Sequence, residues 1–347
     1  MYKISLVMIA RNEARCIERC LSSIQDHVDE IVIVDTGSTD DTVQICQKFT
    51  PHVRHFAWTE DFAAARNFSL AQASGDWNVI IDADEWLIDG GDYLRNLKFT
   101  KPDFVATIRQ ESTFGEDADI KKSSSNISRI LPRGVSYSGR IHEQPIHGMK
   151  LHKSPIVFAH DGYEVAKNTL KMGRNESLLR RELKDHPDDG YFNYQLGKDL
   201  LVQKRYAEAV VYFERALQHS SKTESWRHDL VIRLLFAYKV SKMFDAALNL
   251  ISAEEDRFLE SPDFYFASGD LFLDMSITIP EHAETLLPMI ESSFLTCRSI
   301  GERPDLSGTV HGVGSFLAAH NLYAFYSAIG AADKAEAFLQ LSVSEKR

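Results

Sequence analysis

The spacing of apolar and polar positions divides the chain into two halves. In the first half, short apolar runs alternate with segments that carry apolar residues at helical spacing. Strand and helix taking turns is typical of parallel βαβ units, which bind ligands beyond the carboxyl ends of their strands. Strands are predicted at residues 4–9, 31–34, 53–56 and 77–81, and helices at 13–24, 40–49 and 62–73.

Beyond Trp86 the pattern changes to strands without helices between them. Residues 104–109 and 127–131 have strand patterns and are separated by a polar loop at 115–126. A further strand is predicted at 155–159, just before His160. The α/β half is therefore expected to extend to about residue 166.

From residue 167 to residue 347 the strand signals nearly vanish. Large and small residues recur there in the pattern of tetratricopeptide repeats, which are pairs of antiparallel helices. Such repeats bury a core only collectively and usually expose a concave face. Two roles stay open, a tail that only stabilises the first half and a surface that binds a peptide or partner. The first copy comprises Tyr194, Gln195, Leu196, Gly197, Leu200, Tyr206, Ala209, Phe213 and Ala216, the second Leu234, Leu235, Phe244 and Ala247, and the third Asn321, Leu322, Tyr323, Ala324, Ala335 and Leu339.

Two aspartates follow the apolar run at 77–81. Asp82 and Asp84 are one residue apart, and in extended backbone alternate residues point the same way. Carboxylates that converge at a strand end are good ligands for a hard divalent cation carrying diphosphate oxygens. The alternative is an acidic turn after a strand.

A second acidic strand end lies upstream. The run at 31–34 ends in Asp35 and is followed by a glycine turn and a capped helix. Ser38 and Thr39 can cap that helix, which leaves the Asp35 carboxylate for a ligand. Two acidic strand ends in this order indicate a nucleotide-sugar site.

Four segments in order resemble the motifs of family 2 glycosyltransferases with the GT-A fold. They are SLVMIARNE at 5–13, EIVIVDTGSTD at 30–40, DFAAARN at 61–67 and DADE at 82–85. Within the family, the chain most resembles the branch with a helical-repeat tail, which includes the S-glycosyltransferases of bacterial glycopeptide bacteriocins. The resemblance implies an α/β, Rossmann-like GT-A domain at 1–166 and an all-α tetratricopeptide-like domain at 167–347.

The resemblance also implies roles around the nucleotide. In that family the aspartate at the position of Asp35 contacts uracil, and a carboxylate can accept the uracil N3–H. Arg66 is expected to reach uracil or diphosphate, because its fork can make two parallel bonds to phosphate. A solvated helix arginine is the alternative. Ala10, through its backbone, and Glu13 are expected at the same crevice.

A UDP-sugar donor and a metal ion follow from the same resemblance. Asp84 is the expected metal ligand, and Asp82, with Ala83, is expected at the ribose or at metal-bound water. GT-A enzymes often place a late histidine on the metal, and His160 is the candidate, with a structural histidine as the alternative. Imidazole suits Mn²⁺ better than Mg²⁺, so manganese is favoured and magnesium stays open.

Family 2 enzymes invert the anomeric centre, which requires a general base near the acceptor and no enzyme nucleophile. The chain lacks the Glu-Asp pair that many relatives carry there. Glu143, with His142 beside it, is the substitute candidate, and an edge-strand turn is the alternative. Transfer to a cysteine would depend less on proton removal by the base, because a thiol with a pKa of about 8.5 is partly ionised already.

The composition limits the classes of binding partner and the cellular location that are expected. With 39 basic and 50 acidic residues the net charge is −11, which argues against a nucleic-acid binder. The four cysteines give no disulfide framework, and Cys16 and Cys20 are interpreted as helix packing. The six-residue apolar start is too short for a signal peptide, and no run approaches the roughly 20 residues of a membrane span. A cytoplasmic location is expected.

Three functions remain in competition. In the favoured one, an inverting transferase acts on a Cys or Ser side chain of a peptide or protein held by the repeats. In the second, the acceptor is a cell-envelope glycan or lipopolysaccharide core. The third is a non-catalytic repeat scaffold with a degenerate transferase module, and the intact DAD motif counts against it. The repeats could also pair two copies of the chain in a homodimer.

Overall fold

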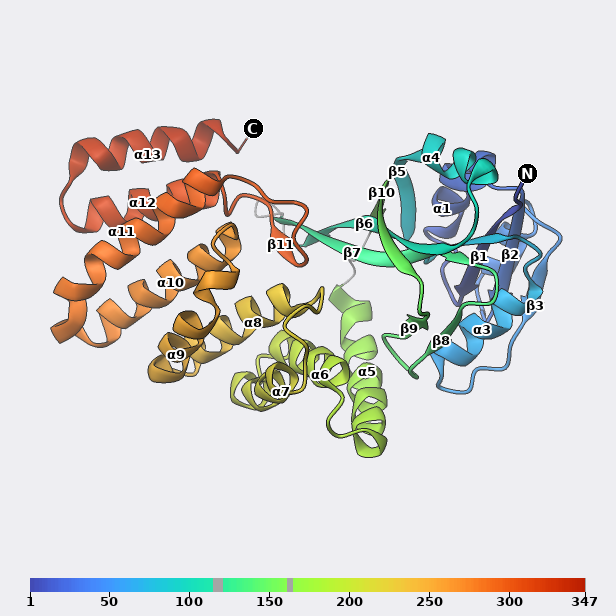
Figure 1. Cartoon of the computed structure of the whole chain (residues 1–347), viewed down its shortest axis with the longest axis horizontal. Helices are drawn as coiled ribbons and strands as arrows, with labels where there is room; N and C mark the ends of the chain where they lie inside the picture. Colours follow the sequence, from blue (N-terminus) through green and yellow to red (C-terminus); the bar gives the residue numbers. More distant parts are fainter. Residues whose placement is uncertain (115–120, 161–164, 347) are drawn as a thin grey trace. The chain divides into compact units, whose positions relative to one another are not determined.

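The computed structural model of the protein describes residues 1–114, 121–160 and 165–346 (Figure 1). Its contacts divide the chain into two compact units, Met1–Glu182 and Leu183–Arg347, which are described separately. The predicted domain boundary after residue 166 falls at the start of helix α5 (Val165–Asp185), whereas the boundary between the units falls near the end of that helix.

A mixed β-sheet forms the centre of the first unit. Its strands follow the order β3-β2-β1-β4-β7-β6-β10-β5. β1 is parallel to β2 and β4, and β2 is parallel to β3, as expected for βαβ units. Antiparallel pairs then appear, β4 with β7, β7 with β6, and β5 with β10. The strands are β1 (Ile4–Ala10), β2 (Glu30–Asp35), β3 (Val53–His55), β4 (Trp77–Ile80), β5 (Glu85–Asp89), β6 (Phe104–Phe114), β7 (Lys121–Pro132) and β10 (Lys150–His160), with a separate hairpin of β8 (Ser136–Ser138) and β9 (Gln144–Ile146).

Both faces of this sheet are buried, which explains the nearly continuous apolar runs of its central strands. Leu6 and Met8 of β1 belong to one core cluster together with Ile17 and Leu21 of helix α1. Val7 lies between them in sequence and belongs to a second cluster, on the opposite face. The helices of this unit are α1 (Ile17–Ile24), α2 (Thr42–Cys46), α3 (Phe62–Gln72), α4 (Gly91–Asn96) and α5, with 3₁₀ turns η1 (Gln25–His27) and η2 (Leu97–Phe99).

The second unit consists of helices that pack in consecutive pairs (Figure 1). Gly197 of α6 shows why small residues recur in the repeat pattern. A β-carbon at this position would lie 2.5 Å from the ring of Phe213 in α7. The helices are α6 (Gly190–Val202), α7 (Tyr206–Gln218), α8 (Arg227–Val240), α9 (Phe244–Glu254), α10 (Pro262–Thr278), α11 (Ala283–Ile300), α12 (Phe316–Ala328) and α13 (Ala332–Ser344), with η3 (Glu255–Arg257), η4 (Pro280–His282) and a short strand β11 (Thr309–Val310).

The fold class predicted from the sequence is confirmed, and several element boundaries are wrong. The helix expected at 13–24 begins only at Ile17, because Glu13 to Cys16 form a turn closed by the Glu13 carbonyl. The helix expected at 40–49 is shortened to α2. Of the loop expected at 115–126, residues 121–126 belong to β7, and residues 115–120 lie outside the described ranges.

Candidate functional site

The ends of β1 and β2 are joined by hydrogen bonds through their following loops. Ala10 pairs with Asp35 in the sheet register, and its carbonyl accepts the Thr36 backbone N–H at 3.0 Å. The Asp35 carboxylate is 2% exposed and accepts backbone N–H groups of Gly37 and Ser38, both at 3.1 Å. Asp35 thus lies at the strand end predicted for it, with its orientation fixed by the turn that follows.

Two further contacts surround this strand end. The His55 ring lies 3.1 Å from the Asp35 carboxylate. Glu13 receives a hydrogen bond from the Cys16 thiol at 3.3 Å, and its backbone N–H donates to the hydroxyl of Thr42. Burial, together with the nearby Glu13 carboxylate, raises the pKa of Cys16 to about 12, so this thiol is not a nucleophile.

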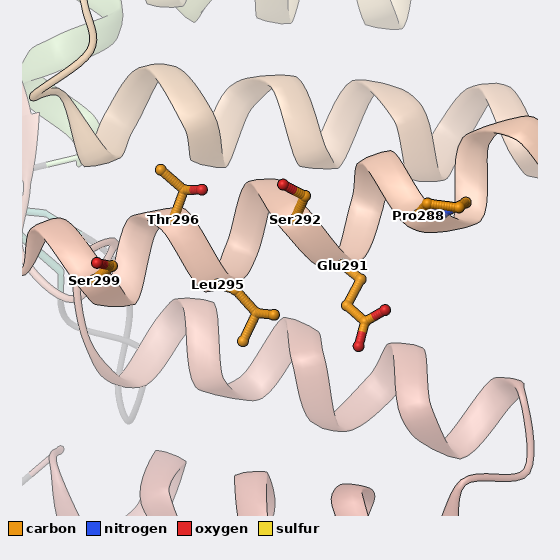
Figure 2. Close-up of a pocket in the computed structure, with 6 residues that line it drawn as sticks. All are labelled: Pro288, Glu291, Ser292, Leu295, Thr296 and Ser299. Atoms are coloured by element: carbon orange, nitrogen blue, oxygen red, sulfur yellow. The ribbon is translucent and has the colours of Figure 1, made fainter.

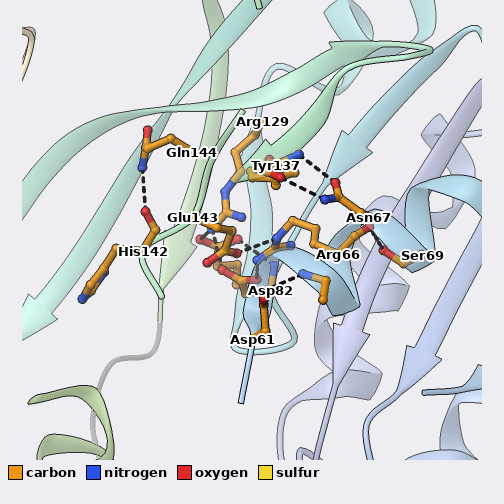
Figure 3. Close-up of polar contacts among 12 residues, drawn as sticks. Asp61, Arg66, Asn67, Ser69, Asp82, Arg129, Tyr137, His142, Glu143 and Gln144 are labelled. Carbon is orange, nitrogen blue, oxygen red and sulfur yellow. Dashed lines mark hydrogen bonds and ion pairs between the residues drawn. The ribbon is translucent and has the colours of Figure 1, made fainter. Parts of the chain in front are cut away.

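Arg66 is placed by the short side chains of α3. Asp61 caps the helix by accepting the Ala64 N–H at 2.8 Å, and the small residues Ala63 and Ala65 are buried where α3 packs on the sheet. The Arg66 guanidinium is buried and donates through Nε to Glu143 at 2.7 Å and through Nη2 to Asp82 at 3.1 Å (Figure 3). The structure therefore brings together three residues that the sequence analysis selected separately.

Arg129 of β7 completes this cluster and was not predicted. It donates to the second carboxylate oxygen of Asp82 and, at 3.1 Å, to Glu85. Glu85 is 1% exposed and also accepts the Asp82 backbone N–H. We call Arg66, Asp82, Glu85, Arg129 and Glu143 the arginine–carboxylate network.

The electrostatics of the network follow from its geometry. Burial alone would raise the pKa of Asp82, but Arg129 and Arg66 outweigh burial and hold this pKa well below its ordinary value. Burial raises the pKa of Glu85, although Arg129 opposes the shift. Asp82 is therefore a fixed anion with each oxygen bonded to a different arginine.

Three buried polar atoms of this region have no hydrogen-bond partner within the described residues. They are Nη1 of Arg66, Nε of Arg129 and the hydroxyl of Tyr137, whose ring lies 5.3 Å from the Arg66 guanidinium. A buried polar group without a partner costs about 1–3 kcal/mol. A ligand oxygen or a water held beside these groups would supply the missing partner.

Asp84 and His160 form a second constellation at the edge of the sheet. Asp84 Oδ2 lies 3.5 Å from His160 Nε2, and the two side chains are 20% and 27% exposed. The other ring nitrogen of His160 lies 3.1 Å from the Ser112 hydroxyl on the neighbouring strand β6. Burial would lower the pKa of His160, but its hydrogen bond to Asp84 raises this pKa instead.

This pair fits a divalent cation that also binds substrate oxygens. Across residues 1–114, 121–160 and 165–346, no group of three or more His, Cys, Asp or Glu side chains is arranged to hold a metal. Two protein ligands are enough where phosphates and water complete the coordination. If the Nδ1 proton of His160 is donated to Ser112, the Nε2 lone pair faces Asp84 and is available for coordination.

The two candidates for the general base are oriented differently. Glu143 is directed toward Arg66, and one of its carboxylate oxygens is bonded to that arginine (Figure 3). The His142 ring points away from Glu143, and the backbone at His142 has a φ of 50°, in the left-handed region. Ala83 is buried between the two aspartates and offers only backbone to a ligand.

A surface hollow of about 360 Å³ lies elsewhere, along helix α11 (Figure 2). Its charged residue, Glu291, already accepts hydrogen bonds from Tyr326 and Lys334. The other residues supply hydroxyl groups and small apolar surfaces, which makes this hollow a poor candidate for chemistry. The lining consists of Pro288, Glu291, Ser292, Leu295, Thr296 and Ser299.

The residues that the sequence analysis missed share one signal. Arg129 stands inside an apolar strand segment, Ile127 to Leu131, and Glu85 directly follows the aspartate pair. Charged residues are rarely fully buried unless they are paired. A charged side chain in the middle of a buried strand could therefore have been read as the partner of the aspartates.

The family model described as "Glycosyl transferase family 2" matches residues 5–146. A Rickettsia felis protein named as an uncharacterized glycosyltransferase is 39% identical over 212 residues, which cover 52% of this chain and 75% of the relative. The SPbeta prophage-derived glycosyltransferase SunS of Bacillus subtilis is 27% identical over 288 residues, or 77% of this chain. A TPR repeat-containing protein of Synechococcus elongatus is 29% identical over 274 residues, or 73% of this chain.

The match covers 66% of the length of SunS and of the Synechococcus protein, just under two thirds. Among solved structures, glucosyl-3-phosphoglycerate synthase from Mycobacterium tuberculosis, in complex with Mn²⁺ and UDP-glucose, is 28% identical over the aligned part. That alignment covers 31% of this chain and 44% of the synthase, with a TM-score of 0.27. A likeness this limited transfers neither ligand to the present chain.

Proposed function

Since the chain belongs to glycosyl transferase family 2, we propose that it is an inverting transferase that moves a sugar from a UDP-sugar to a peptide or protein side chain. The family and the helical repeat region expected from the sequence are confirmed, and the transferase activity is part of the proposal. No helix within the described ranges is both long and apolar enough to cross a membrane.

The observation that carries the proposal is the meeting of Asp84 and His160, 3.5 Å apart, next to an Asp82 fixed by two arginines. In our proposal, Asp84 and His160 hold Mn²⁺ or Mg²⁺. A bound ion would offset the charge that develops on the leaving diphosphate. Asp82 accepts a ribose hydroxyl or metal-bound water.

The remaining residues bind and orient the substrates. Asp35 accepts the N3–H of uracil with a carboxylate lone pair that is not used by the turn after β2. The backbone of Ala10, with Glu13, borders the base. Arg66 donates from Nη1 to a donor oxygen, which supplies the partner that this buried nitrogen lacks among the described residues. Ala83 packs beside the ribose.

Glu143 is proposed as the general base. One of its oxygens is bonded to Arg66, so the carboxylate is held in one orientation and its second oxygen can accept the acceptor proton. A thiol acceptor requires the least of this base, because it reaches its anion near neutral pH. The match to SunS extends over 77% of the chain and thus into the helical unit, which in our proposal presents the peptide acceptor.

The test of the donor site is a thermal-shift panel of nucleotide sugars, each measured with Mn²⁺ and with excess chelator. A ligand that binds only the folded state raises the melting temperature. UDP-sugars should stabilise the protein more with Mn²⁺ than with chelator, and Asp84→Asn should remove that difference. Equal stabilisation of both proteins under both conditions would contradict the metal assignment.

The acceptor is tested with the stabilising donor. Synthetic peptides that contain Cys, Ser or neither are incubated with donor and enzyme, and the added hexose mass is measured. Modification of the Cys or Ser peptides supports the proposal. If the enzyme modified a lipopolysaccharide core and none of the peptides, the proposed peptide acceptor would be wrong. The assignment of the donor site would not be affected.

A further inference from the structure

A cluster of aromatic and charged side chains lies in the helical unit, on facing surfaces of α6 and α8. Its α6 members follow a spacing of three and four residues, which places them on one face of that helix, and the α8 members follow the same spacing from the cap residue onward. We call this cluster the Lys198 site. It consists of Tyr191, Tyr194, Lys198, Trp226, Asp229 and Arg233.

The negative charge of the site is buried and paired. Asp229 is 5% exposed and accepts hydrogen bonds from the Tyr194 hydroxyl and, at 2.6 Å, from Nε of Arg233. Gly308, at a φ of 76°, closes over the same carboxylate, since a β-carbon there would lie 2.2 Å from Oδ1 of Asp229. A ligand cannot reach this anion.

The positive charges remain within reach. The Arg233 side chain is 32% exposed, compared with 6% for that of Asp229. Lys198 is partly exposed, and its ammonium lies 5.0 Å from the ring centroid of Tyr194. Within the described ranges, Lys198 forms no ion pair or hydrogen bond. The site therefore combines two cations with a single, buried anion.

The desolvation of Lys198 supports this charge imbalance. Burial, opposed only in part by Asp229 and assisted by the Arg233 charge, lowers the pKa of Lys198 to about 8. The imbalance occurs in a chain whose acidic residues outnumber its basic ones, 50 to 39. An added carboxylate would supply the missing counter-charge.

Aromatic rings border the two cations. Tyr194 stacks on Trp226 with centroids 5.0 Å apart and an interplanar angle of 18°, and Tyr191 meets the edge of Trp226 at 5.9 Å. Tyr191 and Trp226 are partly exposed. Such rings suit apolar or aromatic side chains, whereas a free inorganic anion would gain nothing from them.

We propose that the Lys198 site binds an acidic peptide segment, with an Asp or Glu carboxylate on Lys198 and Arg233 and a neighbouring apolar side chain on Tyr191 and Trp226. The site lies within the helical unit and requires neither donor nor metal. Its test is a binding measurement, so failure of the transfer assay does not affect it.

The test uses the full chain, immobilised and incubated with a pooled library of N-acetylated, C-amidated hexapeptides. Retained peptides are identified by mass spectrometry. Three proteins are compared: the unchanged chain, Lys198→Gln, and Lys222→Gln as a control with the same change of charge at an exposed position of the same unit. Thermal melts confirm that each protein is folded.

The unchanged chain and Lys222→Gln should enrich peptides in which Asp or Glu adjoins an aromatic or aliphatic residue, by about tenfold, the effect of one favourable charge contact. Lys198→Gln should lose the preference for acidic peptides. Three results would overturn the proposal: no acidic enrichment by the unchanged chain, the same enrichment by Lys198→Gln, or complete displacement of the peptides by an equal concentration of inorganic phosphate.

Discussion

Arg66 donates through Nε to Oε1 of Glu143 at 2.7 Å, so a helix residue of the nucleotide half and the proposed base are held as one ion pair. The same guanidinium donates to Asp82 at 3.1 Å. A single arginine therefore links the carboxylate expected at the donor to the carboxylate expected at the acceptor.

Glu143→Gln should reduce turnover by roughly 10²–10⁴ and leave UDP-sugar affinity nearly unchanged. Glutamine can still accept the Arg66 hydrogen bond through its amide oxygen, so the donor side keeps its geometry, but it cannot take a proton. The measurements are kcat with a thiol and with a hydroxyl acceptor, and the dissociation constant of the donor. The hydroxyl acceptor should lose more rate than the thiol.

His142→Gln is the matched control, because the His142 ring points away from Glu143 (Figure 3). Its turnover should stay within about threefold of the unchanged enzyme, a difference of less than 1 kcal/mol. If turnover fell strongly in His142→Gln and only slightly in Glu143→Gln, His142 and not Glu143 would be the general base.

Ser112→Ala should weaken Mn²⁺ binding by roughly tenfold or more, since the loss of a residue that orients a histidine ligand usually costs 10- to 100-fold in metal affinity. Ser112 lies 3.1 Å from Nδ1 of His160. Mn²⁺ affinity, measured by electron paramagnetic resonance in the presence of UDP, provides a readout independent of turnover. Ser136→Ala, at an exposed position of β8, should change nothing. Equal affinity in all three proteins would remove His160 from the metal site.

Arg129→Met should lower the free energy of unfolding by about 3–5 kcal/mol, because it leaves the charges of Asp82 and Glu85 buried with only part of their compensation. Urea denaturation of the protein measures this loss. Adding Glu85→Gln should recover part of the lost free energy of unfolding, since a neutral amide at this position carries no buried charge for Arg129 to compensate. A double variant as unstable as the sum of its single changes would show that Arg129 acts by packing alone.

Lys198→Met should be more thermostable than the unchanged chain at pH 7. Because the folded-state pKa of Lys198 is lowered from 10.5 to about 8, the unfolded chain binds more protons between these values. The unchanged protein therefore gains stability from this residue as the pH rises through that window. The advantage of the methionine variant should shrink above pH 8 and vanish near pH 10.5. A constant difference in melting temperature across this range would contradict a desolvated ammonium.

The first unit shows what local pattern can predict. The strands β1, β2 and β4 were predicted to within about one residue, since their apolar runs are bounded by charged or small residues. Strand β5 was missed because Glu85 to Asp89 is too polar for a core strand, and it forms only through pairing with β10. Such long-range pairing leaves little trace in a local window.

The candidate site also combines residues that local pattern can predict with residues that only long-range pairing brings together. Asp35, Asp82 and Asp84 were selected because they lie at or just after the ends of predicted strands, where ligands bind in α/β sheets. Arg129 comes from a strand remote in sequence, and only the pairing of β4 with β7 brings it to Asp82. That Glu143 would bond to Arg66 was likewise beyond local reasoning, because a turn after β8 carries it there.

The end of helix α5 contacts the segment that carries Glu143. Glu182, near its end, accepts the backbone N–H of Arg140 and lies 3.5 Å from the Arg140 guanidinium, while the Arg140 carbonyl accepts the Phe62 N–H that opens α3. The segment that carries Glu143 is thus fastened by the first turns of one helix and the last turns of another. A chimaera that joined another helical module before Glu182 would lose the contact of Glu182 with Arg140, and the segment that carries Glu143 would keep its bond to the start of α3.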